Sequence, residues 1–224
     1  MVKSSIITRL FSFSLLAFLI ACQSNVATQV QADQPNSFSP NSSAPKLAEI
    51  ENESIKKVLE SAVEQTKITK TYDPAYVVLP YPNGDVPLEK GVCTDVIIRA
   101  FRRAGVDLQK EVHEDMNKNF SVYPKKWGLK AADSNIDHRR VPNLQTFFTR
   151  RGKSLPITAE ADNYKPGDVV AWDLDGKGLT HIGVVSNIWS ETGKRYQIIH
   201  NIGGGTEVED CLFNWKVIGH YRYF

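Results

Sequence analysis

The sequence predicts an α+β fold, in which helices come first along the chain and a small antiparallel sheet follows. Two observations predict it. Apolar residues recur at helical spacing in segments before residue 152, and the C-terminal third consists of β-type runs separated by glycine-rich turns. Alternating strand and helix units, which would indicate a parallel sheet, do not occur in the pattern. We therefore expect helices packed on one small antiparallel sheet.

Local patterns give the individual elements. Residues 106–163 are irregular apart from one helix, which has Pro142 in its first turn and Gly152 just after its end. The four C-terminal strands are expected to follow one another as a meander. In chain order, we expect a helix over 47–66, a strand over 76–79, helices over 93–104 and 142–151, and strands over 168–172, 181–185, 196–201 and 217–224.

The composition is that of a chain that mostly folds. Of 224 residues, 42% are hydrophobic and 10% are aromatic, which is too apolar for a disordered protein. No apolar span of about 20 residues follows residue 21, and 3 cysteines are too few for a disulfide-stapled scaffold. These counts exclude a polytopic membrane protein and a small disulfide-rich protein.

The first 21 residues have the pattern of a secretory signal. Lys3 and Arg9 precede or flank an apolar run, and Leu19-Ile20-Ala21-Cys22 resembles a bacterial lipobox. We therefore predict a lipoprotein signal peptide over 1–21 and a lipidated Cys22 as the first mature residue. An ordinary signal peptide or an uncleaved anchor is the alternative. Gln23, in place of Asp, indicates sorting to the outer membrane.

The predicted mature chain begins with a disordered tether over 22–46, which is mostly Gln, Ser, Asn and Pro. Signal cleavage removes two cations and no acids, which leaves 25 residues of each sign. A neutral chain lacks the basic surplus that nucleic-acid binding requires. We expect a periplasmic domain over 47–224 that reaches the membrane only through its N-terminal lipid, at the inner leaflet of the outer membrane.

Cys93, His181 and His200 are the candidate catalytic residues. Cys93 begins a predicted helix, whose free N–H groups can stabilise a thiolate and the oxyanion of a tetrahedral intermediate. His181 opens one predicted strand and His200 lies late in the next, so antiparallel pairing puts both at the same end of the sheet. There His181 can take the thiol proton while His200 orients its ring. We expect the helix terminus and His181 to depress the pKa of the Cys93 thiol, against the opposing effect of burial.

The segments around these residues resemble the NlpC-type cell-wall cysteine peptidases. The resemblance rests on Cys93 at a helix start and on Lys165-Pro166-Gly167-Asp168-Val169-Val170, Thr180-His181-Ile182-Gly183-Val184-Val185 and Ile198-Ile199-His200-Asn201. It implies a papain-like fold and cleavage of an amide bond in peptidoglycan stem peptides. It also implies Cys93 as nucleophile, His181 as base and His200 as the orienting residue.

Residues 72–224 are also similar to an uncharacterised bacterial family typified by the YijF protein. That similarity includes Gly91-Val92-Cys93-Thr94-Asp95, Val112-His113-Glu114-Asp115-Met116, the run from Asn135 to Leu144, and Gly219-His220-Tyr221-Arg222-Tyr223. It implies no particular substrate.

Further residues are candidates for binding the substrate. NlpC-type enzymes tend to carry a tyrosine about a dozen residues before the nucleophile, and Tyr81 stands at a comparable distance. Arg139 and Arg140 suit the carboxylates of stem peptides, with the bracing of a loop as the alternative. The full set of candidates is Tyr81, Asp95, His138, Arg139, Arg140 and Trp172.

No cofactor or metal is expected. His113-Glu114-Asp115 lacks the i, i+4 histidine pair of a metallopeptidase helix and is expected to be a solvated face. Cys211 is expected to be an inert core residue. A disulfide between Cys93 and Cys211, which an oxidising periplasm permits, is the alternative.

The sequence therefore predicts a lipid-anchored cysteine hydrolase that acts on peptidoglycan peptides, as an endopeptidase or amidase, through Cys93, His181 and His200. Two other functions remain open. An acyltransferase would use the same residues and pass the acyl group to an amine. A non-catalytic lipoprotein would bind peptidoglycan or a partner and keep the three residues for structural reasons.

Overall fold

A computed structural model describes residues 45–224. The predicted signal peptide, Cys22 and nearly all of the predicted tether lie outside the described residues. Within 45–224, no helix is both long enough and apolar enough to cross a membrane.

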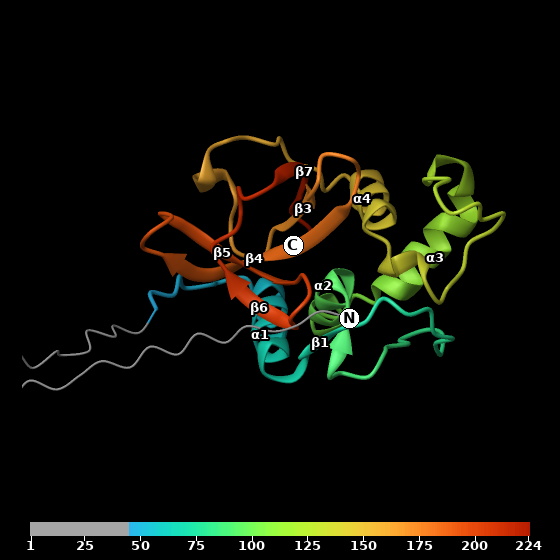
Figure 1. Cartoon of the computed structure of the whole chain (residues 1–224), viewed down its shortest axis with the longest axis horizontal. Helices are drawn as coiled ribbons and strands as arrows, with labels where there is room; N and C mark the ends of the chain where they lie inside the picture. The colour runs from blue at the N-terminus through green and yellow to red at the C-terminus, as the bar shows by residue number, and fades with distance from the viewer. Residues whose placement is uncertain (1–44) are drawn as a thin grey trace, which may run out of the picture. The chain divides into compact units, whose positions relative to one another are not determined.

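Residues 45–224 contain four α-helices, which are labelled in Figure 1. They are α1 (Glu53–Ile68), α2 (Cys93–Arg103), α3 (Leu108–Asn119) and α4 (Val141–Arg150). Helix α1 begins later than the periodicity predicts, because the Asn52 side chain accepts hydrogen bonds from the N–H groups of Ser54 and Ile55 and fixes the start there. Helices α2 and α4 are confirmed to within one residue at each end.

Helix α3 was not predicted, because only Leu108, Val112 and Met116 mark its apolar face and polar residues fill the rest of the segment. Its N-cap is Asp107, whose carboxylate accepts a hydrogen bond from the N–H of Gln109 at 3.1 Å. Residues His113-Glu114-Asp115 of α3 were expected to form a solvated face. Asp115 instead forms an ion pair with Arg150 of α4 at 2.7 Å, which joins the two helices. In Figure 1, α3 lies beyond α2 and α4, away from the sheet.

The main sheet is antiparallel, as predicted, and its strands lie in the order β6-β5-β4-β3-β7. The strands are β3 (Val169–Asp173), β4 (Thr180–Ser190), β5 (Arg195–Asn201), β6 (Thr206–Glu209) and β7 (Lys216–Tyr221). The prediction of a simple meander is wrong at its end. Strand β7 pairs with β3 at the far edge instead of with β6, and the short strand β6 was not predicted.

A separate pair of two-residue strands, β1 (Thr71–Tyr72) and β2 (Lys90–Gly91), is parallel and lies just before α2. The strand expected over 76–79 does not form. The apolar side chains there are largely exposed, with Val78 at 80%, and the backbone N–H of Leu79 donates to the side chain of Asn135 at 2.8 Å. Apolar β-branched residues alone were therefore insufficient to make a strand.

Side chains alternate between the two faces of the sheet, and each face has its own hydrophobic cluster. On β3, Val169 and Ala171 pack with the helices, whereas Val170 and Trp172 pack with Leu212 and its neighbours on the opposite face. Helices α1 and α2 lie side by side against the first face (Figure 1). This arrangement confirms the α+β class and brings the start of α2 against β4.

Candidate active site

Cys93 is the first residue of α2 and is 5% exposed. Backbone N–H groups of Cys93, Thr94 and Ile182 favour a negative charge on its sulfur and so act to lower the thiol pKa. The first two are free because they begin a helix, and the third comes from β4. Cys93 is therefore at a helix start, as predicted, and strand β4 supplies a further N–H group that acts on its sulfur.

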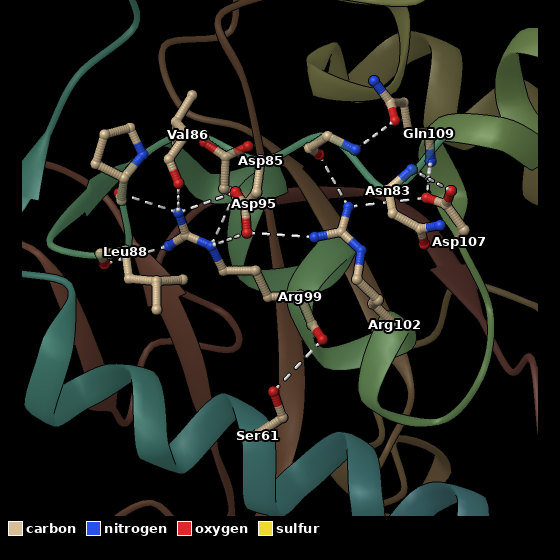
Figure 2. A network of polar contacts seen from close by, with 12 residues as sticks. Ser61, Asn83, Asp85, Val86, Leu88, Asp95, Arg99, Arg102, Asp107 and Gln109 are labelled. Carbon is tan, nitrogen blue, oxygen red and sulfur yellow. Dashed lines mark hydrogen bonds and ion pairs between the residues drawn. The ribbon is translucent and has the colours of Figure 1, made fainter. Parts of the chain in front are cut away.

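The loop before Cys93 is held by an arginine from the same helix (Figure 2). Arg99 donates to both carboxylate oxygens of Asp85, at 3.0 to 3.2 Å, and to the carbonyl oxygens of Val86 and Lys90, at 3.1 and 3.0 Å. The Arg99 side chain is only 6% exposed. Since α2 thus binds the segment that leads into its own first residue, the position of Cys93 is fixed from both sides.

The two predicted histidines lie together on neighbouring strands. His181 Nε2 on β4 is 2.7 Å from His200 Nδ1 on β5, and both residues are buried. The other ring nitrogen of His200, Nε2, is 2.6 Å from Glu209 Oε2 on β6. Trp172 stacks on His181 with ring centroids 5.8 Å apart. The expected juxtaposition of the two histidines is present, and Glu209 extends it.

Cys93 and His181 come from elements that meet, but their side chains are not directly bonded. Among residues 45–224, no hydrogen bond joins the Cys93 sulfur to the His181 ring, and the part of β4 that acts on the charge of Cys93 is the backbone of Ile182, the residue after His181. The two functional groups are therefore neighbours through the strand backbone in this structure. Catalytic hydrogen bonds are often long without substrate and shorten when it binds.

Burial controls the charge state of both groups. It raises the pKa of the Cys93 thiol to about 12, with a further contribution from the Asp95 carboxylate, against the three N–H groups. It lowers the pKa of His181 to about 3, helped by His200. The expectation of a depressed thiol pKa is wrong for this structure, because desolvation outweighs the helix terminus. The resting pair is a neutral thiol and a neutral imidazole.

A cavity of about 200 Å³ opens beside Cys93. Tyr72 of β1 and Thr180, the residue before His181, line it together with Cys93. Burial raises the pKa of Tyr72 to about 12, with further contributions from Cys93 and Asp95, so its hydroxyl keeps its proton. The sequence did not indicate Tyr72, because it lies much further before Cys93 than the dozen or so residues that are usual for the tyrosine of NlpC-type enzymes. Only the pairing of β1 with β2 brings it there.

Two predicted substrate-binding residues, Asp95 and Arg139, bind each other. Their side chains form an ion pair at 2.9 Å and are 4% and 2% exposed. Asp95 also accepts from the N–H of Val92 at 2.7 Å, and Arg139 donates to the carbonyl oxygens of Asp73 and Ala75. Arg139 lines the cavity, but its hydrogen bonds brace the loop after β1, which was the alternative that the sequence left open.

Arg140 and His138 differ in their access to the cavity. Arg140 lines it, stacks on Trp127 at 4.2 Å and pairs with Asp137 at 3.5 Å. His138 does not line it, and burial lowers the pKa of His138 to about 3. Arg140 is thus the cation of this segment that can meet a ligand beside Cys93.

Tyr81 and Trp172 lie away from the cavity. Tyr81 is 43% exposed and its ring contacts His113 on α3 at 5.1 Å. Trp172 is fully buried, and its indole N–H donates to the carbonyl oxygen of Leu212 at 2.8 Å. Trp172 supports the His181 ring from below, and neither residue is placed to touch a ligand at Cys93.

Cys211 lies near the outer end of the histidine pair. Both Cys93 and Cys211 are free, so the alternative disulfide is absent from the described residues. The Cys211 sulfur is 3.6 Å from His200 Nε2, and with Glu209 these atoms form a group of metal-binding types within 4.8 Å of one another. We do not assign a metal to the group, because His200 Nε2 already has a hydrogen-bond partner in Glu209.

This chain is similar to known proteins in sequence and in structure. The uncharacterized protein YijF of Escherichia coli (strain K12) is 54% identical over 180 residues, which cover 80% of this chain and 87% of that protein. An N-acetylmuramoyl-L-alanine amidase from Bacteroides uniformis ATCC 8492 is similar in structure at 11% identity and a TM-score of 0.48, covering 77% of this chain and 100% of that one. NlpC1 from Trichomonas vaginalis is similar at 12% identity and a TM-score of 0.42, covering 80% of this chain and 46% of that one.

The family model described as domain of unknown function (DUF1287) matches residues 59–223. That range begins inside α1 and runs through all of the strands, so it contains Cys93, both histidines and every residue that lines the cavity beside them. Since this match takes in most of the described chain and YijF shares more than half of its aligned residues, the chain belongs to the DUF1287 family.

Proposed function

We propose that this chain is a cysteine hydrolase that cleaves an amide bond in peptidoglycan stem peptides, as an endopeptidase or amidase. One observation carries the chemistry: Cys93 begins α2, where backbone N–H groups of Cys93, Thr94 and Ile182 favour its thiolate form, and His181, paired with His200, lies on β4 next to Ile182. The substrate class comes from the resemblance of the motifs around these residues to NlpC-type enzymes.

The reaction begins when the Cys93 sulfur attacks the amide carbonyl carbon. A sulfur–carbon bond forms, the thiol proton passes to His181, and the carbonyl electron pair moves to oxygen. Backbone N–H groups at the start of α2 and the protonated Tyr72 hydroxyl are the donors available to that oxyanion. Because the resting pair is neutral, the proton moves to His181 as the sulfur attacks, and no thiolate needs to exist beforehand.

The intermediate collapses by breaking the carbon–nitrogen bond, and His181 gives its proton to the leaving amine. Water then attacks the acyl-enzyme carbonyl carbon while His181 takes a proton from it. The carbon–sulfur bond breaks, His181 returns the proton to the Cys93 sulfur, and a carboxylic acid is released. Arg140 lies on the cavity wall, where its charge suits the carboxylates of a stem peptide. We place this activity in the periplasm, on a domain tethered by a lipid at Cys22.

The direct test is digestion of purified peptidoglycan by the wild type and by Cys93→Ala, with mass analysis of the released fragments. We expect new termini at one amide bond with the wild type and none with the variant, which should keep the wild-type circular dichroism spectrum. Equal release by the folded Cys93→Ala protein would refute the cysteine mechanism.

The same experiment separates the two other functions. An acyltransferase would give products in which the acyl group is joined to an added amine, with a mass increase that water cannot produce. A non-catalytic binding protein would sediment with peptidoglycan and release nothing.

A further inference from the structure

Glu209 is the part of the histidine network that the proposed mechanism does not yet use. It is the last residue of β6, and its carboxylate oxygen is 2.6 Å from His200 Nε2. The His200 side chain is completely buried, whereas that of Glu209 is 42% exposed. A half-exposed carboxylate on β6 is therefore the last member of a hydrogen-bonded series that starts at His181 on β4 and continues through His200 on β5.

The chemistry of the three groups fixes where the protons lie. An ionised carboxylate only accepts hydrogen bonds, so His200 must carry its proton on Nε2. In a neutral imidazole the other nitrogen is then an acceptor, so His200 Nδ1 accepts from His181 Nε2 across their 2.7 Å contact. His181 therefore holds its proton on Nε2, and its Nδ1 has a free electron pair.

We propose that Glu209 is a positioning residue that acts through His200 to keep His181 in the tautomer with an unprotonated Nδ1. This inference rests on the proposed function, in which His181 accepts the Cys93 proton. Only a histidine with a free electron pair on the nitrogen not engaged by His200 can do so. Once that proton arrives, the Glu209 charge also stabilises the imidazolium through His200.

Cys211 is a second possible hydrogen-bond partner of His200 Nε2, and it would favour the opposite tautomers. Its thiol is also in contact with His200 Nε2, at 3.6 Å, and burial raises the pKa of Cys211 to about 12, so it keeps its proton. If the thiol donated to Nε2, the His200 proton would lie on Nδ1, and the His181–His200 hydrogen bond would run in the opposite direction, from His200 to His181. His181 would then carry its proton on Nδ1 and be unable to act as a base. Glu209 prevents this because a carboxylate is the stronger partner.

The inference predicts that Glu209→Ala reverses the tautomers, whereas Glu209→Gln retains them in part through its amide oxygen. Glu207→Gln is the matched control, because Glu207 lies two residues earlier on the same strand and is exposed, without a hydrogen bond to His200. Glu209→Ala/Cys211→Ala removes both partners of Nε2 and should recover part of what Glu209→Ala loses.

Two measurements report the histidine tautomers and the reactivity of Cys93 without the natural substrate. Both are made in the presence of EDTA. Nitrogen-15 spectra of histidine-labelled full-length protein, assigned with His200→Asn, report which ring nitrogen carries each proton. Peptide mass mapping gives the rate at which iodoacetamide alkylates Cys93 near pH 8. We expect Nε2–H on both histidines in the wild type and in Glu207→Gln, and a Cys93 alkylation rate roughly tenfold lower in Glu209→Ala.

The results separate this inference from the proposed function. A wild type with Nδ1–H on His200, or a Glu209→Ala protein with unchanged tautomers and alkylation, would overturn the role of Glu209 even if Cys93→Ala abolished peptidoglycan cleavage. If the tautomers respond as expected but no variant or wild type cleaves peptidoglycan, Glu209 orders the histidines and the proposed substrate is wrong.

Discussion

At Cys93, the free N–H groups of a helix start and the effect of burial act in opposite directions on one thiol. The N–H groups favour thiolate, and removal from water disfavours it; burial prevails and raises the pKa of the thiol to about 12. Because the thiolate is the reactive form, we expect Cys93 to react slowly with oxidants and alkylating agents at neutral pH. The site is therefore described better as a neutral pair than as a preformed ion pair.

This charge state predicts how Cys93 responds to pH. Because the thiol pKa is raised, the thiolate fraction and the alkylation rate should keep rising through pH 8.5, by about tenfold per pH unit, without a plateau. Iodoacetamide rates measured by peptide mass mapping between pH 6 and 10 check this. A midpoint below the free value of about 8.5 would show that an ion pair exists instead.

Tyr72 lines the cavity beside Cys93, so its hydroxyl is expected to contribute to catalysis. Tyr72→Phe keeps the ring that lines the cavity and removes only the hydroxyl, so it should lower kcat for stem-peptide cleavage roughly 10²-fold and leave KM nearly unchanged. Rates on defined stem peptides provide the measurement. Tyr81→Phe, which removes the hydroxyl at the spacing favoured by the sequence, serves as the control and should stay within about twofold. Equal losses in both variants would show that the tyrosine at Cys93 has no special role.

At the scale of elements, α2 both carries the nucleophile and binds the loop that precedes it. Arg99 does this with a buried guanidinium that is bonded to Asp85 and to several backbone carbonyl oxygens (Figure 2). Such groups are costly to bury unless every partner is present, so the segment between β1 and α2 and the helix are stable only together. The Asp95–Arg139 ion pair joins the same helix to the turn at Arg139, which also donates to backbone carbonyl oxygens in the loop after β1.

Arg99→Ala should therefore be strongly destabilising. It removes the donor to the carbonyl oxygens of Val86 and Lys90 and leaves Arg102 as the remaining partner of the Asp85 carboxylate, so we expect a loss of about 3 kcal/mol in the free energy of unfolding. Urea titration followed by circular dichroism measures it. Arg103→Ala, an exposed arginine at the end of the same helix, should change stability by less than about 0.5 kcal/mol. A similar small change in Arg99→Ala would show that the loop holds its place without the arginine.

At the scale of the whole molecule, helices cover one face of the sheet and carry the nucleophile, while the histidines come from its strands. The location of that domain in the cell depends on residues that the structure does not describe. Lipidation at Cys22 remains a prediction from the lipobox-like run.

Cys22→Ala should release the protein from the membrane fraction or stop its processing at the precursor mass, because it removes the acceptor of the lipid. Membrane fractionation and intact-mass measurement of the two proteins check this, with Cys211→Ala as the control for loss of a thiol elsewhere. Membrane association and mass that are the same in Cys22→Ala and in the wild type would exclude the lipoprotein.

The sequence by itself determined the elements that carry the catalytic candidates. The apolar spacing after Cys93 predicted α2, and the β-type runs around His181 and His200 predicted two neighbouring strands, because these patterns depend on residues a few positions apart. Family motifs then assigned the same three residues. Helix α3 was missed because few of its residues are apolar, and the strand expected over 76–79 was wrong because no partner strand lies beside it.

Only the tertiary structure decided what surrounds those residues. Tyr72 reaches the cavity through a parallel strand pair, Glu209 meets His200 through β6, and Arg139 is paired with Asp95 across 44 positions of sequence. No local period encodes such contacts, because each depends on which segments fold against one another. The same holds for the pKa of Cys93, which the sequence places at a favourable helix start. Burial, a property of the assembled core, reverses that preference.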